Sequence, residues 1–172
     1  MSKTVTASKI LNLLKGEWSL NRKLINAKDK DFSGSASGTT KFLECDENTL
    51  SYDERIKVNF VNGIEVDATA TYKFQIEEDK LHQYLVTPTS TEPKEDHMFE
   101  LDFFTTPSQI CSEASYICGS DNYNVRYSFH NNDSFSITYT VSGPNKNYST
   151  ETEFERVLPI GKNPETEIGS EY

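Results

Sequence analysis

The sequence predicts an all-β protein, a single antiparallel β-barrel of roughly nine or ten strands behind one short N-terminal helix. Apolar and polar residues alternate with a period of two through most of the chain, which is typical of strands with one buried face. Turn residues interrupt this alternation at intervals of roughly 8–15 residues, as in sandwiches and barrels. The chain also has ten Phe and nine Tyr, and these side chains are favoured on pleated surfaces.

The one helical pattern covers residues 6–15. Its apolar residues recur at helical spacing and are Ile10, Leu11, Leu13 and Leu14. Thr6 or Ser8 can cap the first turn, and Gly16 follows where a helix would end. The period changes to two from Glu17 onward, so we expect a strand directly after the helix.

The expected strands cover residues 17–24, 39–44, 50–58, 66–76, 81–87, 98–104, 123–129, 135–141 and 148–157. Residues 27–38 form a loop that leads into a strand of small residues, and residues 108–119, after Pro107, have the least regular pattern. Asn62-Gly63 predicts a tight hairpin. Small residues occur at expected bends, namely Gly34, Gly38, Ala68 and Ala70. They favour closure of the sheet, because a closed barrel has no exposed edges.

Length and charge limit the classes of function. We expect one barrel domain over residues 1–158 and a polar, acidic, flexible tail over residues 159–172. The net charge of −10 repels phosphate backbones, so nucleic acid is not an expected partner. No apolar run approaches the roughly 20 residues that cross a bilayer, so we expect no membrane insertion.

Cysteine usage predicts a cytoplasmic location. Cys45, Cys111 and Cys118 are too few, and odd in number, for a disulfide framework. The N-terminus also lacks the basic, apolar and small-residue pattern of a signal peptide. Free thiols are the favoured state, and a Cys111–Cys118 disulfide is the alternative.

Gly16-Glu17-Trp18, placed between a helix and a long strand, resembles the G-x-W motif of the calycin superfamily, which includes lipocalins and fatty-acid-binding proteins. The resemblance implies a lipocalin-like barrel in which Trp18 fills the closed end and an arginine of the last strand covers the indole. Arg156 has the expected place for that arginine, and a cation over an indole face is favourable. The alternative is a core tryptophan and an unrelated surface arginine.

A closer resemblance runs through nearly the whole chain. Five motifs occur in order: Leu14-x-Gly16-x-Trp18-x-Leu20-x-Arg22, Gly34-x-Ala36 before Phe42, Leu50-Ser51-Tyr52-x-Glu54, Cys118-x-x-Asp121-x-Tyr123-x-Val125-x-Tyr127, and Val141-x-Gly143-Pro144-x-Lys146-x-Tyr148. Together they are similar to an uncharacterised lipocalin-like family of bacteria, fungi and plants that carries a domain-of-unknown-function label. The family resemblance implies the barrel and no particular activity.

The chain departs from that family's pattern at two places. Where a Phe-His pair is expected, the sequence is Ser108-Gln109-Ile110-Cys111, and Tyr116 stands where a second His is expected. The resemblance therefore carries no imidazole chemistry to this chain.

Charged and phenolic side chains in phase with the buried face are candidates to line the barrel. Arg22 and Glu54 are expected to pair inside it, because an isolated buried charge is costly. Arg126 is out of phase with Tyr127 and is expected to face outward. The complete candidate ligand-binding set is Arg22, Tyr52, Glu54, Asp121, Tyr123, Tyr127, Lys146 and Tyr148. The alternative role of this set is a structural hydrogen-bond network that fixes strand register.

The sequence predicts no catalytic residue, cofactor or metal site. His82, His97 and His130 have no Cys or His at ligand spacing. We find neither a nucleophile elbow nor a Gly-rich phosphate loop.

The leading functional hypothesis is a non-catalytic barrel that binds a small molecule, either anionic or partly apolar. The first alternative is a small enzyme or cofactor-handling protein, similar to barrel-type pigment lyases, that uses Arg22, Glu54, Asp121 and Tyr123. The second alternative is an exported or partner-binding protein, suggested only by the acidic residues near the C-terminus.

Overall fold

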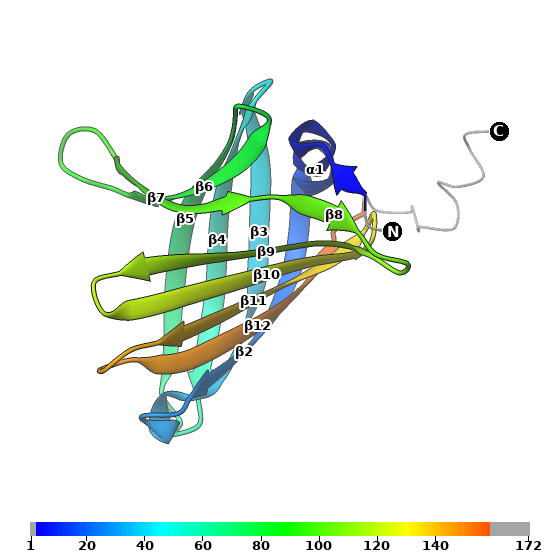
Figure 1. Ribbon diagram of the computed structural model, residues 1–172. Helices are drawn as coiled ribbons and strands as arrows, with labels where there is room; N and C mark the ends of the chain where they lie inside the picture. The colour runs from blue at the N-terminus through cyan, green and yellow to red at the C-terminus, as the bar shows by residue number, and fades with distance from the viewer. Residues whose placement is uncertain (1–2, 159–172) are drawn as a thin grey trace.

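The computed structural model describes residues 3–158, and the tail expected over residues 159–172 lies outside the described residues. The elements in chain order are β1 (Thr4–Val5), α1 (Ala7–Leu14), β2 (Gly16–Asn26), η1 (Lys30–Phe32), β3 (Gly34–Asp46), β4 (Thr49–Phe60), β5 (Glu65–Glu77), β6 (Lys80–Thr87), β7 (Lys94–Leu101), β8 (Phe103–Thr105), β9 (Ile110–Cys118), β10 (Asp121–Asn131), β11 (Ser134–Ser142) and β12 (Asn147–Arg156). All strands belong to one antiparallel sheet that curls around a core (Figure 1). The predicted all-β, barrel-like fold is confirmed.

The expected count of nine or ten strands was too low, because the sheet has twelve. The expected strand over residues 98–104 is two strands, β7 and β8, and β1 adds a short edge strand beside β8. β9 occupies much of the segment that looked least regular. Cys111 and Ser112 are adjacent and both buried, which breaks the period of two on which strand prediction depends.

The helix closes one end of the curled sheet. Thr6 caps α1 by accepting a hydrogen bond from the Lys9 N–H at 3.2 Å. Ile10, Leu11 and Leu14 are fully buried against the core of the sheet. The chain then turns directly into β2 through Gly16, whose φ of 119° is a conformation that favours glycine.

Gly38, where a bend was expected, lies close to the backbone of the neighbouring strand. A β-carbon at this position would collide with the backbone carbonyl of Arg55 on the neighbouring strand β4. A side chain at this position would therefore force β3 and β4 apart.

The hydrogen-bonded order runs β1-β8-β9-β10-β11-β12-β2-β3-β4-β5-β6-β7, so it has two ends, at β1 and β7. β7 contacts β9 across the resulting seam, where the Phe99 and Tyr116 rings lie 6.3 Å apart. Within residues 3–158, the two ends of the sheet are joined here by side-chain packing and not by backbone hydrogen bonds. The expectation that closure removes both sheet edges is therefore corrected. Charged residues of β7, such as Lys94 and Glu95, protect the exposed edge.

The three cysteines are free thiols, so the Cys111–Cys118 disulfide is not formed. Cys111 is buried, whereas Cys45 and Cys118 are exposed. No helix in residues 3–158 has the length and apolar character needed to span a bilayer.

Candidate functional site

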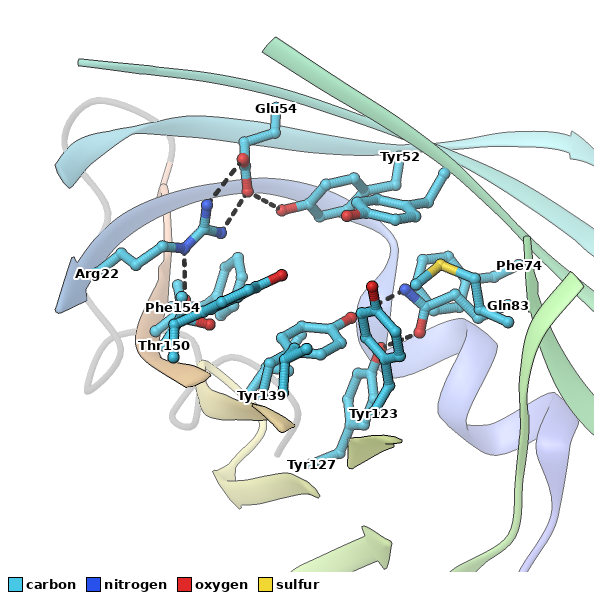
Figure 2. A pocket seen from close by; sticks show the side chains of 16 residues that line it. Arg22, Tyr52, Glu54, Phe74, Gln83, Tyr123, Tyr127, Tyr139, Thr150 and Phe154 are labelled. Atoms are coloured by element: carbon cyan, nitrogen blue, oxygen red, sulfur yellow. Dashed lines mark hydrogen bonds and ion pairs between the residues drawn. The ribbon is translucent and has the colours of Figure 1, made fainter. Parts of the chain in front are cut away.

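A cavity of about 210 Å³ lies within the curled sheet (Figure 2). Six of the eight sequence-predicted site residues line it: Arg22, Tyr52, Glu54, Tyr123, Tyr127 and Tyr148. Apolar side chains complete much of the wall, among them Phe74, Met98, Ile137, Val141 and Phe154. The cavity is thus an apolar chamber with polar groups at fixed positions, which is the usual composition of a small-molecule site.

An ion pair forms one wall of the cavity. The Arg22 guanidinium donates two hydrogen bonds to the Glu54 carboxylate, at 2.9 and 2.5 Å, and its Nε donates to the Thr152 hydroxyl at 2.8 Å. The Tyr52 hydroxyl donates to the same carboxylate at 2.6 Å. Figure 2 shows Arg22 on β2 facing Glu54 and Tyr52 on β4. Four hydrogen bonds therefore hold this pair in a single geometry.

The protonation states of this wall follow from its burial and charges. Burial lowers the pKa of Arg22, but the hydrogen bond and charge of Glu54 outweigh that effect and raise it above its ordinary value. Burial, with the neighbouring Glu54 charge, holds the pKa of Tyr52 well above its usual range. Arg22 is thus a cation and Tyr52 a neutral phenol at neutral pH.

A second polar group spans β10, β6 and β11. The Tyr127 hydroxyl donates to the Gln83 side-chain oxygen at 2.6 Å, and the Gln83 amide nitrogen donates to the Tyr139 oxygen at 3.0 Å. Burial raises the pKa of both Tyr127 and Tyr139. The chain of donors runs in one direction and ends at Tyr139, whose own proton is used by neither of these two bonds.

Two predicted site residues, Asp121 and Lys146, do not line the cavity. The Lys146 ammonium donates to the Tyr123 hydroxyl at 3.0 Å and lies 3.6 Å from the Asp121 carboxylate. Tyr123 belongs to the lining, so this Asp121–Lys146 pair sits beside the cavity, on the turn-proximal ends of β10 and the β11–β12 connection.

The structure brings Trp18 and Arg156 together at the helix end of the sheet. The guanidinium carbon lies 4.2 Å from the centroid of the indole. Arg156 also donates to the carbonyls of Leu13 and Lys15 at 2.8 and 2.7 Å, which are free carbonyls at the end of α1. The indole N–H donates to the Leu14 carbonyl at 2.8 Å.

Other polar residues lie away from the cavity. Arg126 is exposed, as expected, and pairs with Glu113 at 3.2 Å. His82 Nδ1 and His97 Nε2 lie 2.9 Å apart on neighbouring strands, at a site outside the cavity lining. Within residues 3–158, no three His, Cys, Asp or Glu side chains form a group that could hold a metal ion.

Comparison with known proteins identifies the family. A family model described as "Family of unknown function (DUF6314)" matches residues 14–156. The chain belongs to DUF6314. No curated protein matches this DUF6314 chain.

Solved structures share the fold of this DUF6314 protein. Rv2717c from M. tuberculosis is 12% identical, with a TM-score of 0.60 over 91% of this chain and 100% of that one. The S-type phycobiliprotein lyase CPES from Guillardia theta is 8% identical, with a TM-score of 0.56 over 90% and 94% of the two chains. The redesigned β-barrel mFAP1, bound to DFHBI, is 14% identical, with a TM-score of 0.44 over 85% and 97%. For Rv2717c and CPES, identities this low establish a common fold only.

Sequence reasoning missed five polar residues of the DUF6314 cavity, namely Tyr72, Gln83, Tyr139, Thr150 and Thr152. A signal for them existed, because each is two or four positions from an apolar residue on the same strand face: Phe74, Leu81, Ile137 and Phe154. The phase of the strand therefore identified the correct side. It did not indicate which inward residues face a cavity and which are packed.

Tyr72→Phe is expected to make the stability of the protein less sensitive to alkali. Burial, with the nearby Tyr139 and Glu54, raises the pKa of Tyr72 in the folded protein. In the unfolded chain the Tyr72 hydroxyl loses its proton at about pH 10. Stability contributed by Tyr72 is thus complete below about pH 10 and is lost as the pH rises toward its higher folded pKa. The free energy of unfolding should fall less steeply in the variant, by up to about 1.4 kcal/mol per pH unit.

Urea unfolding at several pH values above neutrality measures this slope. No described residue hydrogen-bonds to the Tyr72 hydroxyl, so the variant should match the wild type at neutral pH, which serves as the internal control. Equal slopes in alkali for the two proteins would show that Tyr72 titrates normally when folded.

Proposed function

We propose that this protein is a non-catalytic binding protein that holds a small, partly apolar molecule inside its β-barrel. The observation that carries the proposal is the cavity itself, in which apolar side chains share the lining with the Arg22–Glu54 pair and the Gln83–Tyr139 group. Fixed polar groups of this kind orient a ligand, and the apolar walls supply most of the binding free energy. The free thiols support a reducing, cytoplasmic setting.

The size of the cavity limits its occupant. A volume of 210 Å³ is below the roughly 300–1,000 Å³ of typical drug-sized sites. It corresponds to about seven water molecules at the ~30 Å³ that each occupies in the liquid. A compact one- or two-ring molecule is therefore the proposed class of ligand.

The alternative is an enzyme or a cofactor-handling protein like the pigment lyases. The fold shared with the phycobiliprotein lyase supports this alternative. The distribution of the proposed acid–base groups opposes it, because Glu54 is fully engaged by Arg22 and Tyr52, while Asp121 lies outside the cavity lining. The partner-binding alternative depends on acidic residues beyond position 158, outside the described residues.

Small aromatic probes are expected to raise the melting temperature. At ten times its dissociation constant, a ligand that binds only the folded state adds about 1.4 kcal/mol, or roughly 3–6 °C for a domain of this size. Thermal shift with naphthalene, 2-acetylnaphthalene and 2-naphthoate tests this, together with native mass spectrometry for co-purifying molecules.

Thr150→Phe fills the cavity and should abolish these shifts, because Thr150 is part of the lining. Ser149→Phe is the matched control, because it adds the same ring to the outward face of the same strand. If none of the three probes shifts the melting temperature and the purified protein carries no molecule, the binding function is refuted.

A further inference from the structure

The charges inside the cavity cancel. Among the lining side chains only Arg22 and Glu54 carry formal charge, and two hydrogen bonds join them. The Thr152 hydroxyl accepts a hydrogen bond from Nε of Arg22, and the Tyr52 hydroxyl donates one to the Glu54 carboxylate. An entering anion would have to displace Glu54 from Arg22, or remain buried without a counter-charge, and either arrangement is unfavourable.

Lys146, a cation beside the cavity, gives an anion little help. Lys146 already donates to the Tyr123 hydroxyl and lies 3.6 Å from the Asp121 carboxylate. Its side chain is 46% exposed, so solvent and salt screen its charge. The charge at this position is thus balanced as well.

The cavity does present hydrogen-bond donors. The oxygen of Tyr139 accepts from Gln83, so that hydrogen bond does not use the Tyr139 proton. The hydroxyl of Tyr72 also lines the cavity and is bonded to no residue within the described part of the chain. Burial raises the pKa of both phenols, so both keep their protons at neutral pH. An acceptor oxygen on a ligand would accept hydrogen bonds from these two hydroxyls.

We propose that the cavity selects uncharged ligands that carry a hydrogen-bond acceptor, such as a ketone, ester or ether oxygen, and rejects carboxylates of the same shape. The Arg22–Glu54 pair enforces the charge selection, and Tyr72 and Tyr139 bind the acceptor. This inference rests on the proposed binding function and specifies its ligand class.

Isothermal titration with the same three probes tests the selection. The ketone 2-acetylnaphthalene and the anion 2-naphthoate have nearly the same shape, and naphthalene lacks the acceptor. The wild type should bind the ketone at least about tenfold more tightly than the anion, since an uncompensated buried charge is costly. Titration in about 1 M salt, where the Debye length is about 3 Å, removes the long-range effect of the net charge of −10, and the preference should persist.

Two variants test the charge selection and the acceptor site separately. Glu54→Gln frees Arg22, so affinity for 2-naphthoate should rise about tenfold or more while affinity for the ketone changes little. Tyr139→Phe should weaken the ketone about three- to tenfold, the usual value of one hydrogen bond, and leave naphthalene unchanged. Circular dichroism checks that each variant is folded. The wild-type comparison needs no variant, so the proposal stays testable if Glu54→Gln does not fold.

The outcomes separate this inference from the proposed function. Binding of 2-naphthoate to the wild type as tightly as the ketone, in high salt, would overturn the charge selection while leaving the binding function intact. Equal affinities for naphthalene and the ketone would overturn the acceptor site. Absence of binding by all three probes would instead refute the binding function itself.

Discussion

Trp18→Ala is expected to lower the free energy of unfolding by about 3–5 kcal/mol, the usual cost of removing a fully buried aromatic side chain. Trp18 has no exposed surface. Its ring meets the Phe135 ring edge-on with centroids 4.8 Å apart, and the Arg156 guanidinium lies over its ring. Its N–H also fixes the Leu14 carbonyl at the end of α1. The substitution therefore opens a void where the helix, the first long strand and the last strand meet.

Urea unfolding followed by circular dichroism measures this loss, because Trp18 is the protein's one tryptophan and fluorescence would be lost with it. Trp18→Phe is the graded control. It keeps most of the apolar volume but loses the hydrogen bond to Leu14, so its cost should be smaller, about 1–3 kcal/mol. A loss below about 1 kcal/mol for Trp18→Ala would mean that the closed end of the barrel does not depend on this residue.

Arg22→Met should destabilise the protein by about 3–5 kcal/mol, because it leaves a buried carboxylate without a counter-charge. Glu54 is only 5% exposed, and two of its three side-chain hydrogen bonds come from Arg22. The methionine preserves most of the aliphatic volume of arginine, so the measured loss reports mainly the unpaired charge.

The double variant Arg22→Met/Glu54→Leu removes both charges and should recover most of that loss, because apolar replacements of a buried pair are often neutral or stabilising. Arg126→Met is the matched surface control. Its partner Glu113 is exposed, so the cost should be about 0–1 kcal/mol. If Arg22→Met costs no more than Arg126→Met in urea unfolding, the cavity pair is not a buried interaction in solution.

The inward position of the site residues was predictable because strand phase is a local property. Trp18, Leu20 and Arg22 have a period of two, and the structure buries the first two and turns the third toward the cavity. The same rule gave Tyr52 and Glu54 a common face. Turn residues such as Asn62-Gly63 likewise predicted the connection between β4 and β5.

The predicted strand count is too low because period-two alternation does not identify strands that are irregular or very short. β9 has two consecutive buried residues, Cys111 and Ser112, so its pattern does not alternate. β1 has two residues and β8 three, which is too short for any periodicity. These strands form because neighbouring strands offer unpaired backbone groups, as β8 does for β1.

The sequence by itself determined which side chains face inward, the position of the helix, and the family. Only the tertiary structure decided which inward side chains meet. Tyr127 and Gln83 are 44 positions apart in the chain, yet they share a hydrogen bond across the lumen. Asp121 and Lys146 had a suitable phase and still lie outside the lining. The reason is that phase is set by the backbone of one strand, whereas contacts across a cavity depend on the curl and register of all twelve strands together.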